Sequence, residues 1–148
     1  MRSQNHSLHG LQMNKPNISY SGSRFKQMNP YSSYHLSFNI GYPNRYERGK
    51  GYTGSAIMVH GDCVSIGCFA MGDNSIEEIW TLLVKAFEAG QQHIQLHSFP
   101  FRMKESNKEK HSNSQWFSFW SNLQEGYLIF EENGVPPRVT VVGGSYCF

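Results

Sequence analysis

The sequence predicts an α+β domain, because segments with the two-residue period of strands are interspersed with segments of helical period. Apolar residues recur at every second position from 34 to 40, and at three- and four-residue spacings from 76 to 87 and from 116 to 123. A chain of 148 residues with 39% hydrophobic residues is long and apolar enough for one domain with a core. We therefore expect a domain over residues 25–148, preceded by a polar, poorly ordered tail over residues 1–24.

The strands are predicted from alternation and from short apolar runs. Tyr34, Leu36, Phe38 and Ile40 alternate with polar residues, which predicts a strand with one buried face, and residues 41–44 follow as a turn. The polar stretch that comes next predicts a loop. Three further strands are expected over these segments: residues 55–60, 93–99 and 138–142.

Two helices are expected between these strands. The first begins at a capping box made by Ser75 and Glu78, and Gly90 ends it. The second covers residues 114–124. We assign its apolar stripe to the core rather than to a sugar-binding platform: Trp116, Phe119, Trp120 and Leu123.

Composition argues against several classes of protein. The net charge is only +2 and the Lys and Arg residues are scattered, so no basic stripe indicates nucleic-acid binding. No apolar run approaches the ~18 residues of a transmembrane helix. Three cysteines cannot all pair within one chain, which disfavours a disulfide framework. The first residues lack the apolar core of a secretory signal, so none is predicted.

The segment HGDCVSIGC, residues 60–68, concentrates groups that carry chemistry. His60, Cys63 and Cys68 could bind zinc with His97 as a fourth ligand, although the second pair of closely spaced ligands usual in structural zinc sites is absent. Alternatively, His60 could take the proton of Cys68, and Gly67 would allow a sharp turn that exposes the sulfur beside backbone N–H groups. A cysteine and a histidine at this spacing are more often a buried thiol and a hydrogen-bonded histidine.

A resemblance extends this interpretation. The segments MNPYSSYHLSFNIGYPN, TGSAIMVHGDCVSIGCFAMGDNSIEEIW, GQQHIQLHSFPFRM and WFSFWSNLQEGYLIFE resemble the YafK-like branch of the YkuD-type L,D-transpeptidases, from about Met28 to Phe148. The resemblance implies a YkuD-like mixed β-sheet or sandwich catalytic domain with two helices. It makes Cys68 the nucleophile and His60 the base.

Ser65 and Gly67 match the positions that flank the family's cysteine. Position 66 is Ile where the wider family has a histidine, and the YafK-like branch also resembles this sequence in lacking it. Cys63 lies outside the motif, so for Cys63 and Cys147 we expect buried, small apolar side chains.

The resemblance also implies a substrate and a compartment. Family members transfer acyl groups of peptidoglycan stem peptides to an amine or to water, need no cofactor, and in this branch include amidases that detach a wall-linked lipoprotein. Residues expected to contact the substrate are Arg102, which could pair with a carboxylate, together with His97, Tyr34 and His35. The expected location is the periplasm or cell envelope.

Two features of the sequence conflict with this expectation. No export signal is predicted, and related proteins have early strands ahead of the MNP segment that pack in the catalytic sheet. The sequence therefore predicts a truncated chain or a shortened relative whose N-terminal strands are missing. The alternative function is a non-catalytic relative that binds peptidoglycan or a partner.

Overall fold

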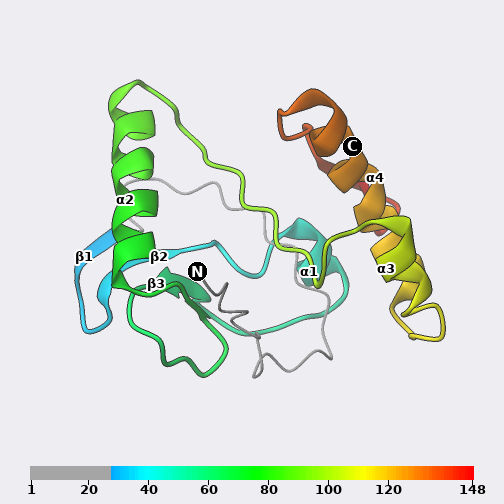
Figure 1. Ribbon diagram of the computed structural model, residues 1–148, viewed down its shortest axis with the longest axis horizontal. Helices are drawn as coiled ribbons and strands as arrows, with labels where there is room; N and C mark the ends of the chain where they lie inside the picture. Colours follow the sequence, from blue (N-terminus) through cyan, green and yellow to red (C-terminus); the bar gives the residue numbers. More distant parts are fainter. Residues whose placement is uncertain (1–27) are drawn as a thin grey trace, which may run out of the picture.

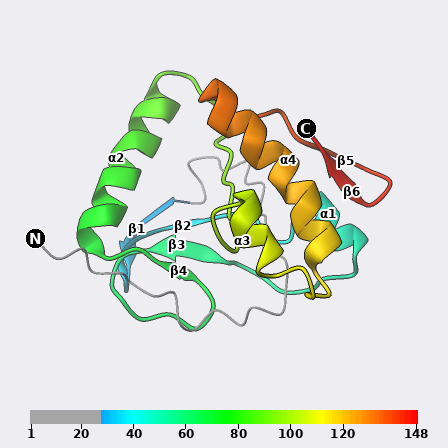
Figure 2. The same cartoon turned by 45° about the vertical axis from the view of Figure 1, so that its right-hand side comes forward.

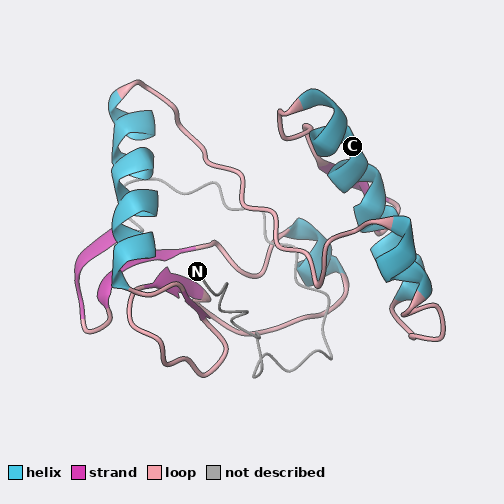
Figure 3. Ribbon diagram, viewed as in Figure 1, coloured by secondary structure: helices cyan, strands magenta, loops and turns pink. Residues whose placement is uncertain are grey.

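The computed structural model describes residues 28–148. The predicted tail, residues 1–24, lies outside the described residues, as do residues 25–27. The described chain is a mixed α+β fold, which confirms the predicted class (Figures 1 and 3). Its elements in chain order are β1 (Met28–Ser32), β2 (His35–Asn39), α1 (Arg45–Gly49), β3 (Met58–His60), β4 (Phe69–Ala70), α2 (Asp73–Glu88), α3 (Glu105–Glu109), α4 (Phe117–Asn133), β5 (Thr140–Val142) and β6 (Ser145–Cys147).

Four strands form a mixed sheet in the order β1-β2-β3-β4. The pairs β1–β2 and β2–β3 are antiparallel, whereas β3 and β4 run parallel. The register aligns Ser37 with His60, and Phe38 with Val59. Because successive side chains of a strand point to opposite faces, Phe38 and Val59 share one face of the sheet, and Ser37 and His60 share the other.

Helix α2 packs against the apolar face of this sheet, and Figure 1 shows its N-terminal end next to β2 and β3. Its buried residues Ile76, Leu83 and Phe87 have helical spacing and pack with residues of β2 and β3, as the sequence predicts. The predicted capping box at Ser75 and Glu78 is wrong, since the helix begins at Asp73 with Gly72 at the N-cap and no side-chain cap. Backbone hydrogen bonds from Met71 N–H to the His60 carbonyl and from Gly72 N–H to the Asp62 carbonyl hold the chain just before Asp73, where the helix begins.

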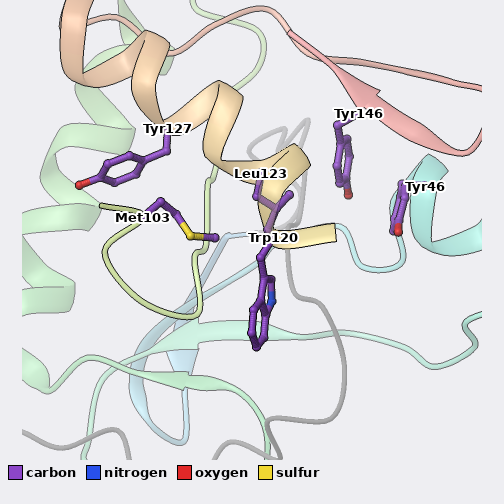
Figure 4. Packing of buried hydrophobic residues seen from close by; sticks show 6 residues of the cluster. All are labelled: Tyr46, Met103, Trp120, Leu123, Tyr127 and Tyr146. Atoms are coloured by element: carbon purple, nitrogen blue, oxygen red, sulfur yellow. The ribbon is translucent and has the colours of Figure 1, made fainter. Parts of the chain in front are cut away.

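Helix α4 forms a second cluster with α1 and the β5–β6 hairpin (Figure 2). Figure 4 shows the buried side chains of this cluster, which are Tyr46, Met103, Trp120, Leu123, Tyr127 and Tyr146. The Tyr46 and Tyr146 rings stack with centroids 4.6 Å apart and thereby join α1 to β6. Trp116 and Phe119 pack against the same cluster, so the assignment of the aromatic stripe to the core is confirmed.

Two local expectations are wrong. Residues 93–99 form no strand, although Ile94 and Leu96 still pack on the core beneath α2. The polar stretch after residue 44 contains α1, which is stabilised by a capping box between Asn44 and Glu47. The described residues therefore contain four helices rather than two, and the two additional ones, α1 and α3, are short.

None of the helices in residues 28–148 is long and apolar enough to cross a membrane.

The carboxyl group of Glu47 generates a prediction about pH. Its side chain is 1% exposed and one of its oxygens, Oε1, has no hydrogen-bond partner, and burial raises the pKa of Glu47 to about 7. A carboxyl with a raised pKa stabilises the fold below its unfolded pKa of 4.5, and this contribution is lost as the pH rises through about 7. We expect the free energy of unfolding to fall by about 1–2 kcal/mol over that range, allowing for partial hydration of the carboxylate.

Chemical denaturation at several pH values measures this loss. Glu47→Gln should remove it, because Gln also serves in a capping box and cannot ionise. The exposed Glu132→Gln is the matched control, and its free energy of unfolding should still fall with rising pH as in the unsubstituted protein. A slope that persists in Glu47→Gln would assign the pH dependence to other groups.

Gly126 generates a second prediction. A Cβ at this position of α4 would overlap the ring of Phe148. Overpacking of about 1–3 kcal/mol outweighs the gain of up to about 1 kcal/mol in helix propensity, so Gly126→Ala should lower the free energy of unfolding. In a Phe148→Ala background the same substitution should become neutral or stabilising, which a double-mutant cycle by denaturation would measure. Gly49→Ala, where a Cβ would meet nothing within 4 Å, is the control.

Candidate active site

A pocket of about 590 Å³ lies over the face of the sheet to which His60 belongs. Strands β1, β2 and β3, the β1–β2 turn and the loop before β4 all contribute to its wall. The residues that line it are Asn29, Ser32, Ser33, Tyr34, Ser37, Met58, His60, Val64, Ser65, Ile66 and Cys68. The pocket therefore combines the predicted base and the predicted nucleophile with neutral polar and apolar side chains.

His60 is the last residue of β3 and is 4% exposed. Its Nδ1 lies 2.6 Å from the carbonyl oxygen of Gly61. A carbonyl can only accept, so Nδ1 carries the hydrogen and the lone pair of the neutral ring is at Nε2. The ring of Tyr34 packs on the imidazole with centroids 4.8 Å apart at 40°. These contacts hold the ring in the tautomer that a general base requires.

Cys68 immediately precedes β4 and lies beside Met58 in the parallel register. The backbone N–H of Met58 donates to its Sγ at 3.4 Å. Met58 and His60 are two residues apart on one strand and therefore share a face. The register thus explains why Cys68 and His60 line the same pocket, although no hydrogen bond joins them in the described structure.

The loop between His60 and Cys68 is held at both ends. At the start, a Cβ on Gly61 would come within 2.6 Å of Asp73 Oδ1 and 2.8 Å of the Tyr34 carbonyl oxygen, so only glycine fits. At the end, the Ser65 hydroxyl donates to the carbonyl of Cys68 at 2.8 Å. Gly67 has φ = +108°, a conformation that favours glycine. These contacts set the position of the sulfur.

The structure separates the predicted substrate-binding residues into two groups. Tyr34 lines the pocket, but His35 has φ = +68° and its Nε2 lies 2.7 Å from Glu77 Oε1 on α2. His97 lies outside the pocket wall, with Nε2 3.1 Å from Gln95 Oε1, and burial lowers the pKa of His97. Arg102 is exposed and also lies outside the wall. A substrate-binding role for these residues stays a prediction.

Sequence reasoning missed most of the pocket wall, namely Asn29, Ser32, Ser33, Ser37, Met58, Val64 and Ile66. Asn29 is aligned with Ser37, which is aligned with His60, so the three lie in one row across β1, β2 and β3. Ser37 is 3% exposed and was visible as a polar position of the alternating strand. Asn29 had no comparable signal, because β1 lacks the alternation that predicts a strand.

The cysteines differ from expectation in one respect. Cys63 and Cys147 are exposed rather than buried, because Cys63 lies in a surface loop and Cys147 ends the outer hairpin. Within residues 28–148, no three His, Cys, Asp or Glu side chains come close enough together to hold a metal ion.

Comparison with known proteins identifies the family. No family model matches the chain. The chain is 45% identical over 120 residues to the Escherichia coli K12 protein described as "Putative L,D-transpeptidase YafK". The matched region covers 81% of this chain and 49% of that relative. The chain contains a YafK-like L,D-transpeptidase domain. The Escherichia coli O157:H7 protein of the same description matches with the same values, so this chain spans about half the length of the curated relatives.

Proposed function

We propose that this L,D-transpeptidase domain carries out cysteine-dependent acyl transfer on peptidoglycan stem peptides, with Cys68 as nucleophile and His60 as base. The observation that supports the proposal is the shared pocket, in which the Nδ1–H of His60 is bonded to Gly61 and its Nε2 has the basic lone pair. The stem peptide as substrate rests on the resemblance to the L,D-transpeptidases, the activity that the name of the matched relatives gives.

The proposed reaction has two halves. In the first, His60 Nε2 takes the proton of the Cys68 thiol, and the thiolate attacks an amide carbonyl of the stem peptide. The backbone N–H groups near Gly67 and Cys68 hold the oxyanion. The C–N bond then breaks, the proton on His60 passes to the leaving amine, and a thioester remains on Cys68. In the second half, an amine or water attacks the thioester and returns the proton to sulfur.

The choice between amine and water distinguishes a transpeptidase from an amidase. Among the described residues, those that line the pocket include no Lys, Arg, Asp or Glu, so none of them offers a cation to a carboxylate on the leaving group. This supports an amide whose leaving amine brings no nearby carboxylate, such as a lysine side chain of a lipoprotein linked to the wall. We therefore favour hydrolysis of such a link, which would place the protein in the periplasm or cell envelope.

Covalent labelling tests the nucleophile. Intact mass after incubation with a disaccharide-tetrapeptide or a carbapenem should show an acyl adduct on the unsubstituted protein and none on Cys68→Ala, because only the thiol at position 68 faces the pocket. Cys63→Ala, which removes an exposed thiol of the same loop, should keep the adduct.

An adduct that persists in Cys68→Ala would contradict the assignment of the nucleophile. A folded protein without any adduct would support the alternative, a relative that binds peptidoglycan or a partner without turnover.

Arg102 is proposed to hold a carboxylate of the stem peptide outside the pocket. Arg102→Ala should then raise KM by about 5- to 10-fold with kcat retained, a loss in the range of one charge-assisted hydrogen bond. The effect should vanish on a substrate with amidated carboxylates. The exposed Arg138→Ala is the control for a general loss of positive charge. Equal KM values for the two variants on the free acid would exclude the contact.

A further inference from the structure

One peptide group links the predicted base to a carboxylate on α2. The carbonyl of Gly61 accepts from His60 Nδ1–H at 2.6 Å, and the N–H of Asp62 donates to Asp73 Oδ1 at 2.7 Å. The Gly61 carbonyl and the Asp62 N–H belong to the same planar peptide unit. A continuous chain of hydrogen bonds therefore runs from Asp73 through this peptide to the imidazole.

Such a chain has an electrostatic consequence. An anion that accepts a hydrogen bond from the N–H of a peptide group polarises that group and increases the negative partial charge on the peptide's carbonyl oxygen. Hydrogen bonds in series strengthen one another in this way. The oxygen of Gly61 then becomes a better acceptor for His60 Nδ1–H. This favours the tautomer with the lone pair at Nε2 and stabilises the imidazolium that forms when the base takes a proton.

The surrounding contacts make this arrangement rigid. Backbone bonds of 2.9 Å run from Met71 N–H to the His60 carbonyl and from Gly72 N–H to the Asp62 carbonyl. Asp62, on one side of this peptide group, has φ = +58°, in the left-handed region. Asp73 Oδ1 also lies against Gly61, where it would be 2.6 Å from an added Cβ. Asp73 is the first residue of α2, where the helix dipole favours a negative charge.

We propose that Asp73 is a positioning residue that acts on His60 through the Gly61–Asp62 peptide group. The inference rests on the proposed role of His60 as base. It adds a fourth member to the site, with the order Cys68, His60, peptide 61–62 and Asp73. Asp73 is not among the residues that line the pocket, so we infer that it acts through the peptide group.

The size of the expected effect on kcat depends on how exposed Asp73 is to solvent. Asp73 is exposed to solvent, so water screens part of its charge. Removing both the charge and the acceptor in Asp73→Ala should lower kcat by about 10- to 100-fold, the range seen when a group that orients a functional histidine is removed. Asp73→Asn keeps an acceptor for the Asp62 N–H, so it should recover at least half of that loss on a logarithmic scale.

Two readouts test the proposal. The first is kcat and KM for the amide substrate, where Asp73→Ala should lower kcat with KM within about twofold of the unsubstituted protein. The second is the NMR resonance of the His60 Nδ1 proton, recorded in a Cys68→Ala background so that no turnover is needed. This resonance should move upfield in Asp73→Ala and by a smaller amount in Asp73→Asn. Glu78→Ala, which removes another exposed carboxylate near the start of α2, should change neither readout.

The outcomes separate this proposal from the proposed function. A His60 proton resonance that does not move in folded Asp73→Ala overturns the relay, whether or not the protein has activity. A shifted resonance in a protein without turnover supports the relay and contradicts the proposed function. If Asp73→Ala does not fold, as its denaturation curve would show, the resonance in Asp73→Asn decides: a shift supports the relay and an unchanged position overturns it.

Discussion

Strand β3 pairs with β2 on one side and with β4 on the other, and these two pairings position both the core and the pocket. This strand has only three residues, and its register decides which side chains face α2 and which face the pocket. Val59 lies in the core, while His60 faces the pocket beside Ser37. A slip of one residue would exchange these faces, so the apolar contacts of α2 stabilise the orientation of His60.

The parallel pairing of β4 completes the site from the other side. It returns the chain alongside β3 after a loop of eight residues and places Cys68 next to Met58. The start of that loop packs between the β1–β2 turn and the first residue of α2, and Gly61 leaves room for both. The proposed chemistry thus depends on the β3–β4 pair, on the β1–β2 turn and on the start of α2. We therefore expect the site to be sensitive to residues outside the pocket wall, such as Asp73.

The two hydrophobic clusters have different relations to the site. The cluster under α2 supports the sheet and hence His60, whereas the cluster around α4 and the β5–β6 hairpin lies away from the pocket. Helix α1 contributes Tyr46 to the second cluster, and the segment that follows α2 contributes Ile94 and Leu96 to the first. This segment, rather than a strand, carries His97, which explains why that side chain does not join the pocket.

The sequence by itself determined the features that depend on local periodicity. The alternation of Leu36, Phe38 and Ile40, the apolar face of α2 and the aromatic stripe of α4 all bury as their spacing predicts, because burial on one face needs no knowledge of the partner. The segment from His60 to Cys68 was also identifiable from its residue types as the place where chemistry could occur.

Only the tertiary structure decided which residues meet there. Residues 93–99 have the pattern of a strand but find no partner strand, since pairing depends on distant segments. The positive φ of His35 breaks the alternation and leaves Tyr34 over the imidazole instead of in the core. The link from Asp73 to His60 runs through a backbone peptide, whose orientation no residue pattern specifies.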